Sequence, residues 1–306
     1  MSRPVRKPET NTFLKNIVIH PELDRALDAI KTAHATSGSK PQGTIIYGES
    51  GVGKTTVINE YIREFPPVEI EDRTCMPVVV IETQAGQNTK SVMQELLEAM
   101  DIICPPRATQ TTLFSLIRRA FSDLGVELVI CDEFQELLPQ KTKDSPNIMR
   151  FIKKLMNQTG VPWVLVGTTP TRQVLETSDN QLRRRFNGAY KIAPFSMTTE
   201  DEREDFVSYI ALVQEVLPVK CYDLTEENML LRLFTATGGI PGYISNLFEK
   251  LIECWDGQSR ATLELFSEAY QRAFVGCGDT FFGANVPFDP FLESITTVKN
   301  YQGKRK

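Results

Sequence analysis

Apolar and polar positions along the first two thirds of the chain predict strands and helices in alternation. Apolar residues recur at helical spacing over residues 21–35, 54–65, 89–100, 109–124 and 147–159. Short apolar runs of strand length occur at 44–47, 78–82, 128–131, 163–167 and 190–194. Strands that alternate with helices predict an α/β fold, in which a parallel sheet carries helices on both faces.

The pattern changes near residue 195, and this change predicts a domain boundary. The segments 199–216, 225–237, 242–254 and 261–274 all have helical spacing, and no convincing strand lies between them. We therefore expect four parts: a flexible N-terminal arm (1–15), an α/β core (16–195), an all-α lid (196–274) and a C-terminal tail (275–306). The tail is rich in Gly, Pro and Phe, which disfavours a regular helix. Its phenylalanines either pack on the lid or dock on a partner protein.

The turn between the first apolar strand and the next helix carries the strongest motif, G-x-x-x-x-G-K-[ST]. Its glycines allow the backbone to curl, so that successive N–H groups can face phosphate oxygens. Lys54 is then expected to reach the β- and γ-phosphates of ATP, and the Thr55 hydroxyl to hold Mg²⁺. The predicted ATP-binding residues are Gly48, Glu49, Ser50, Gly51, Val52, Gly53, Lys54, Thr55 and Thr56.

Two further strand ends carry polar residues that suit ATP hydrolysis. The strand at 128–131 ends in Asp132 and Glu133. Asp132 is expected to bind the nucleotide and its Mg²⁺, and Glu133 to polarise the attacking water. The strand at 163–167 is followed by Thr168, whose hydroxyl can contact this water or the γ-phosphate; an ordinary strand-to-loop turn is the alternative.

Three arginines precede Phe186, and the last of them, Arg185, is a candidate arginine finger that would enter the site of a neighbouring copy. The alternative is a solvated helix face. The motifs in order resemble those of AAA+ ATPases, and within that class the chain is similar to the transposon-encoded TniB/TnsC family. The similar segments are 125–133, 164–168, 179–186 and 236–239.

The resemblance implies specific roles for residues of this chain. Lys54 and Thr55 match the Walker A pair, Asp132 and Glu133 the Walker B pair, Thr168 the sensor 1 residue and Arg185 the finger. It also implies a regulator of transposition that oligomerises on double-stranded DNA as a ring or filament and links a target-selection protein to a transposase, in the bacterial cytosol or nucleoid. One departure is the stretch 238–243, which lacks the arginine called sensor 2 in many AAA+ lids. Nucleotide sensing by the lid is therefore expected to be weak.

Charge and composition limit the kinds of partner and compartment that we expect for this chain. The formal net charge is −5, so any contact with DNA must use a local patch. The helices that begin near Thr89 and Thr109 offer N–H groups to phosphates, together with Lys90, Arg107 and Thr109; plain helix capping is the alternative. No apolar run of about 18 residues predicts a membrane span, and cysteines without paired spacing favour the reducing cytosol.

Other functions are compatible with parts of this pattern. A helicase loader or replication initiator would share the AAA+ motifs. A P-loop signalling switch would need no DNA. A small-molecule kinase would need neither the glutamate of the Asp-Glu pair nor an arginine from a neighbour, so these features count against it.

Overall fold

The computed structural model describes residues 6–16, 18–70, 73–139, 141–173, 183–274 and 288–303. The chain forms two compact units, one of residues 22–193 and one that joins residues 1–21 to residues 194–306. The division between residues 193 and 194 lies within two residues of the boundary expected near residue 195. The grouping of residues 1–21 with the helical unit was not expected.

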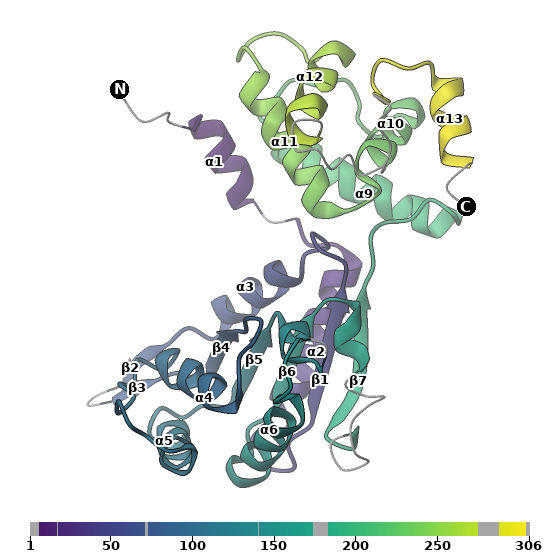
Figure 1. Cartoon of the computed structure of the whole chain (residues 1–306). Helices are drawn as coiled ribbons and strands as arrows, with labels where there is room; N and C mark the ends of the chain where they lie inside the picture. The colour runs from purple at the N-terminus through teal and green to yellow at the C-terminus, as the bar shows by residue number, and fades with distance from the viewer. Residues whose placement is uncertain are drawn as a thin grey trace. The chain divides into compact units, whose positions relative to one another are not determined.

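The α/β unit contains a five-stranded parallel sheet, as the sequence predicts (Figure 1). Its strands are β1 (Gly43–Gly48), β4 (Val78–Glu82), β5 (Leu128–Asp132), β6 (Trp163–Gly167) and β7 (Phe186–Ile192), in the order β4-β5-β6-β1-β7. Its helices are α2 (Pro21–His34), α3 (Lys54–Glu64), α4 (Thr89–Glu98), α5 (Gln110–Asp123) and α6 (Ser145–Thr159). Strand β7 begins four residues before the predicted fifth strand, because it pairs with the full length of β1.

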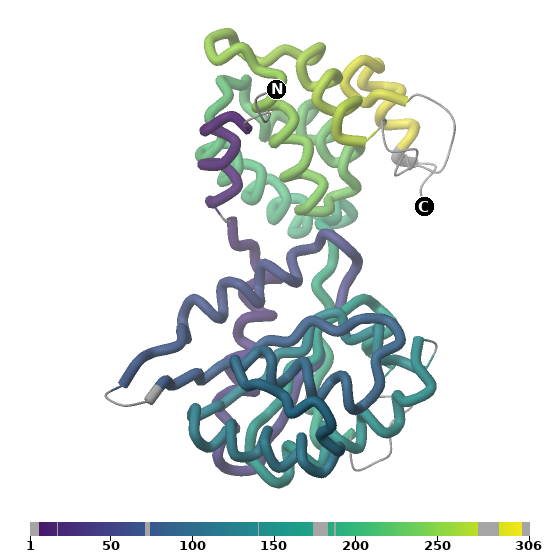
Figure 2. The backbone as a smooth tube through the Cα atoms, turned by 60° about the vertical axis from the view of Figure 1, so that its left-hand side comes forward, coloured from purple at the N-terminus to yellow at the C-terminus, as the bar shows by residue number. Residues whose placement is uncertain are grey.

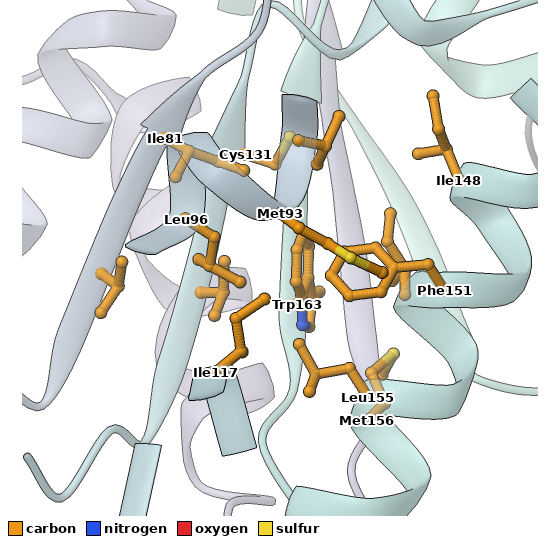
Figure 3. Close-up of a cluster of buried hydrophobic side chains, with 14 of the residues drawn as sticks. Ile81, Met93, Leu96, Ile117, Cys131, Ile148, Phe151, Leu155, Met156 and Trp163 are labelled. Atoms are coloured by element: carbon orange, nitrogen blue, oxygen red, sulfur yellow. The ribbon is translucent and has the colours of Figure 1, made fainter. Parts of the chain in front are cut away.

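Alternate residues of each strand enter two separate cores, since successive side chains of a strand point to opposite faces of a sheet. One core packs strand residues such as Ile45, Val129 and Trp163 against α4, α5 and α6. Figure 3 shows Trp163 of this core beside Phe151 and Leu155 of α6. The other core packs Ile46, Ile130 and further strand residues against α2 and α3. The three central strands β1, β5 and β6 are buried on both faces, which explains their continuous apolar runs.

A short hairpin that the sequence pattern did not predict follows α3. Strands β2 (Val68–Ile70) and β3 (Arg73–Cys75) pair antiparallel, and in Figure 2 the hairpin projects from the α/β unit. Val68 and Ile70 remain about half exposed. Three-residue strands give too little alternation to be recognised in a sequence.

In the described residues, the helical unit contains the four helices expected after residue 195 and two more. The expected helices are α9 (Glu200–Val216), α10 (Glu227–Thr237), α11 (Pro241–Cys254) and α12 (Leu263–Phe274). The additional ones are α1 (Pro8–Lys15) and α13 (Ile295–Gly303). No helix in the described part of the chain is long and apolar enough to cross a membrane.

Both ends of the chain differ from the expectation. Residues 8–15 of the expected arm form α1, whose Phe13 lies in the helical core with its ring centroid 6.4 Å from that of Phe248. In the tail, Phe291 is fully buried against Phe266 of α12. The tail from 288 onward therefore packs on the lid, and a regular helix, α13, follows. Residues 275–287 and 304–306 lie outside the described residues.

Candidate nucleotide-binding site

The G-x-x-x-x-G-K-[ST] loop connects the end of β1 to the first residue of α3. Gly51 and Gly53 have φ values of 81° and 105°, a region that favours glycine. A Cβ on Gly48 would lie 2.3 Å from the carbonyl oxygen of Ile192, so a side chain there would collide with β7. The loop conformation therefore requires glycine at these three positions.

Lys54 is the first residue of α3, and its side chain turns back into the loop. Its exposed fraction is 7%, and Nζ donates to the carbonyl oxygens of Gly48 (3.1 Å) and Glu49 (2.7 Å). Burial lowers the pKa of this ammonium group, and the carboxylates of Glu133 and Asp132 oppose that shift. The loop thus holds a cation close to the two carboxylates at the carboxyl end of β5.

These residues fit the triphosphate of a nucleotide and a magnesium ion. The first turn of α3 has no acidic residue and no side-chain cap, so its N–H groups remain available for an anion. Thr55 is exposed beside them, and no residue in the described ranges hydrogen-bonds its hydroxyl. Asp132 supplies a largely buried carboxylate whose pKa burial raises. A divalent cation between Thr55 and Asp132 would favour the ionised carboxylate.

Glu133 follows Asp132 in an unusual backbone conformation. Its φ is 52°, in the left-handed region that non-glycine residues rarely adopt. Thr83, at the end of the neighbouring strand β4, fixes this turn, because its hydroxyl donates to the carbonyl oxygens of Asp132 and Glu133, at 3.0 Å each. The Asp132 carboxylate in turn accepts from the N–H of Glu133 at 2.8 Å.

Gln135 connects Glu133 to Thr168. Its Nε2 donates to the Glu133 carboxylate, while its Oε1 accepts from the backbone N–H of Thr168 at 2.9 Å. A Cβ on Gly167 would lie 2.4 Å from this Oε1, so the bridge also depends on a glycine at the end of β6. Neither Gln135 nor Thr83 was among the predicted residues, although each lies within two residues of a predicted strand end or motif.

The sheet topology explains why these groups meet. In the order β5-β6-β1, the carboxyl ends of three adjacent parallel strands carry Asp132 and Glu133, then Thr168, then the glycine-rich loop. Ligands of open parallel sheets bind at this edge. The structure therefore brings together the residues predicted at the three strand ends.

Arg185 lies elsewhere. Its carbonyl oxygen accepts from Gly43 N–H at the start of β1, whereas the glycine-rich loop follows Gly48 at the other end of that strand. Gly43 and Gly48 are five residues apart along β1, which corresponds to about 16 Å. The half-exposed Arg185 is thus outside this chain's own loop site. The matched segment 179–182 lies outside the described residues.

The residues predicted to contact DNA lie at the starts of α4 and α5. The expectation that both helix starts offer free N–H groups to phosphates is wrong for α4. At the start of α4, Asn88 accepts from the N–H groups of Lys90 and Ser91, and Asp144 accepts from that of Thr89. These donors are therefore not free for a phosphate. At the start of α5, Thr109 caps the helix by accepting from Thr112 N–H at 3.2 Å, and Arg107 is exposed.

Comparison with known proteins assigns the chain to a family. The sequence profile described as "Bacterial TniB protein" matches residues 14–193, more than half of the chain. The chain belongs to the TniB family. Together with the fold, this makes the TniB chain an AAA+ ATPase, as its motifs predict.

The TniB chain is similar in sequence to a protein named for DNA replication, and its fold is similar to those of solved structures. It is 25% identical over 207 residues to a putative ORC1-type DNA replication protein 1 of Thermoplasma acidophilum, a match that covers 63% of the TniB chain and 56% of that relative. Cdc6p of Pyrobaculum aerophilum has a similar structure, with a TM-score of 0.64 and 13% identity over 96% of the TniB chain and 84% of the other. The ORC2 protein of Aeropyrum pernix gives a TM-score of 0.60 and 13% identity, over 86% and 72%. The structural matches describe the fold alone.

Proposed function

We propose that this TniB protein hydrolyses ATP at the edge formed by β5, β6 and β1. The observation that carries the proposal is the buried Lys54 of the loop beside the Glu133–Gln135–Thr168 bridge. Lys54 neutralises charge on the β- and γ-phosphates. Thr55 and Asp132 are the residues that would hold Mg²⁺, which when bound screens the phosphate charge and orients the transferred group.

The remaining groups suit an attack by water on the γ-phosphorus. Glu133 orients the water and accepts its proton as the new O–P bond forms and the bond to the bridging oxygen of ADP breaks. Thr168 lies on the other side of Gln135 and is positioned to contact the water or the γ-phosphate. The products are ADP and inorganic phosphate.

Gln135 is expected to set the position of Glu133 rather than to touch the nucleotide. Gln135→Met keeps a similar side-chain shape but removes both hydrogen bonds, and a hydrogen bond to a charged group contributes roughly 1.5–3 kcal/mol. We expect kcat to fall about tenfold while ATP affinity stays within about twofold, measured by phosphate release and by titration with a fluorescent ATP analogue. An unchanged kcat would show that the bridge does not matter for turnover.

We propose further that the hydrolytic site is completed by Arg185 of a neighbouring copy. Its separation from this chain's own loop supports a role in trans. Arg185→Ala is then expected to leave ATP binding by the monomer near normal but to impair assembly and to reduce hydrolysis by a factor on the order of 10³, the lower range for such arginines. The exposed neighbour Arg184→Ala is the matched control.

Mixing variants tests the shared site directly. Arg185→Ala and Glu133→Gln each damage a different half of a trans site, so mixed assemblies contain some intact sites. Activity should rise above that of either variant alone. No recovery at any mixing ratio would contradict a finger in trans.

The wider role that we propose is regulation of transposition on double-stranded DNA, with contacts to a target-selection protein and a transposase. Membership of the TniB family supports it. ATP is expected to convert the monomer into rings or filaments on duplex DNA, visible by electron microscopy, and DNA should change the rate of ATP hydrolysis. An ATPase that remains monomeric and indifferent to DNA would contradict this proposal and favour a signalling switch.

A replication-initiator or helicase-loader role is the second candidate, and the match to an ORC1-type protein favours it. The two roles differ in what the ATP-bound protein recruits. Stimulation of transposase strand transfer supports the first, and delivery of a replicative helicase to DNA supports the second.

A further inference from the structure

A groove in the helical unit lies among α10, α12 and α13. It is lined by residues from 222–232, by residues from 261–266 and by Ile295, the first residue of α13; α13 lies beside α10 (Figure 1). Its volume is about 610 Å³, whereas a cavity for one water molecule needs only roughly 10–15 Å³. The groove therefore has room for several side chains of a partner.

Two segments of the chain expose apolar surface in this groove. Tyr222 is 65% exposed and Leu263 is 40% exposed, and both line it. Other apolar lining residues, such as Leu224 and Phe266, are almost fully buried in the core of the helical unit. Those residues hold the walls in place, while Tyr222 and Leu263 supply the surface that a ligand can cover. Because removal of apolar surface from water favours association, these two side chains are the anchor points for a docking partner.

Carboxylates surround this exposed apolar surface. Asp223, Glu226 and Glu264 line the groove and are exposed, and Arg232 is the single cation among its described lining residues. Arg232 is buried, and its guanidinium group donates to two backbone carbonyl oxygens of the segment that precedes α13. The groove thus has an excess of negative charge that this cation is not free to neutralise.

The three carboxylates are available to a cationic partner. Hydrogen bonds from Thr225 lower the pKa of Asp223, and a hydrogen bond from Thr262 lowers the pKa of Glu264, so both groups are ionised at neutral pH. Within the described ranges, neither of them nor Glu226 forms an ion pair.

Tyr222 already contacts a cation from outside the groove lining. The guanidinium carbon of Arg260 lies 4.7 Å from the centroid of the Tyr222 ring, a distance typical of a cation–π interaction. The ring nevertheless keeps most of its surface exposed, so a further apolar or cationic side chain can contact it. An aromatic ring among carboxylates suits a ligand that is both apolar and positively charged.

We propose that this groove binds a short basic segment of a partner protein, with a bulky apolar residue that packs on Tyr222 and Leu263. Lysine or arginine residues beside it pair with Asp223, Glu226 and Glu264. A nucleic acid does not fit, because these carboxylates would repel its phosphates. A metal ion does not fit either, since no cluster of three or more His, Cys, Asp or Glu residues in the described part of the chain could hold one. This binding needs no nucleotide and does not rest on the hydrolytic site.

The test uses the full chain and fluorescein-labelled twelve-residue peptides, with fluorescence anisotropy at low salt and without nucleotide. The first peptide carries Lys at most positions, with Leu and Phe four residues apart so that they share one helix face. A second has Ser in place of Leu and Phe, and a third has Glu in place of Lys. Unlabelled spermine, a polyamine without side chains, is titrated as a competitor. We expect the first peptide to bind with a Kd of about 10–100 μM and the other two peptides at least tenfold more weakly.

Leu263→Ser tests the apolar contact and should weaken binding of the first peptide at least tenfold. Leu212→Ser is the matched control, because Leu212 is 45% exposed on α9 of the same unit and does not line the groove. We expect this control to change the Kd by less than about twofold. The melting temperature of each variant checks that it is folded.

The double variant Glu226→Lys with Glu264→Lys tests the charges and should also weaken the first peptide at least tenfold. Glu204→Lys with Glu215→Lys makes the same change of net charge at exposed positions of α9, outside the groove. That control should stay within about twofold of the parent protein.

Several results would overturn the proposal. The first is no binding of the Lys, Leu and Phe peptide up to about 1 mM. Equal binding of the Ser-substituted peptide, or displacement of the first peptide by spermine at the same concentration, would leave only a general attraction for cations. Equal weakening by the α9 controls would have the same meaning. Altered self-assembly of the Glu226 and Glu264 double variant with unchanged peptide binding would assign the groove to a second copy of this chain.

Discussion

Replacing Lys54 by alanine is expected to lower the affinity for ATP at least 100-fold. In the structure the ammonium group is buried in the loop and bound only to loop carbonyls, so it is already placed for phosphate oxygens. Its loss removes charge-assisted hydrogen bonds worth roughly 1.5–3 kcal/mol each, and each 1.4 kcal/mol is a factor of ten in affinity. Titration with a fluorescent ATP analogue measures the effect.

Lys40→Ala provides the control, because Lys40 is an exposed lysine that precedes β1 in the same unit. Its affinity should stay within about twofold of the parent protein. If Lys54→Ala binds ATP as tightly as this control, the loop is not a phosphate-binding loop, and the proposed hydrolytic site fails with it.

Glu133→Gln is expected to bind ATP normally and to lose turnover by about 100-fold or more, the usual contribution of a general base. The amide of the new side chain can still accept the hydrogen bond from Gln135, so the bridge to Thr168 is preserved while proton acceptance is lost. Assemblies of this variant should persist longer on DNA. Phosphate release under saturating ATP gives the rate.

The matched control is Glu136→Gln, in the 3-10 turn that follows Glu133 and paired with Lys141. We expect its rate to lie within about twofold of the parent. If Glu133→Gln hydrolyses ATP at the rate of the parent protein, Glu133 is not the residue that activates water. That result would not bear on the binding of ATP through Lys54, which is tested separately.

The sequence predicted the parts of the site that are continuous along the chain. The glycine-rich loop, the Asp-Glu pair and Thr168 each follow an apolar strand, and parallel strands bring their carboxyl ends together. Gln135 and Thr83 could not be assigned in this way. Their roles depend on which strands are neighbours and on the left-handed turn at Glu133, and neither feature leaves a local pattern.

In the fold, too, elements with a local sequence pattern were predicted, and elements that depend on distant contacts were not. Strands buried on both faces and amphipathic helices have strong periodic signals, and the sequence predicted all five sheet strands. Helix α1 has eight residues, and α13 follows a segment rich in proline and glycine. Short helices are marginal by themselves. Burial of Phe13 and Phe291 against residues distant in sequence stabilises these ends of the chain, and local composition cannot reveal such contacts.

The inclusion of residues 1–21 in the helical unit has a consequence for biosynthesis. Helix α1 contains Phe13, whose ring partner Phe248 is made more than two hundred residues later. Lys7 donates to the carbonyl oxygen of Ile252, which is likewise made more than two hundred residues later. The α/β unit, continuous from 22 to 193, can complete its core in the interval. Helix α1 is therefore synthesised before the α/β unit but reaches its native contacts after it.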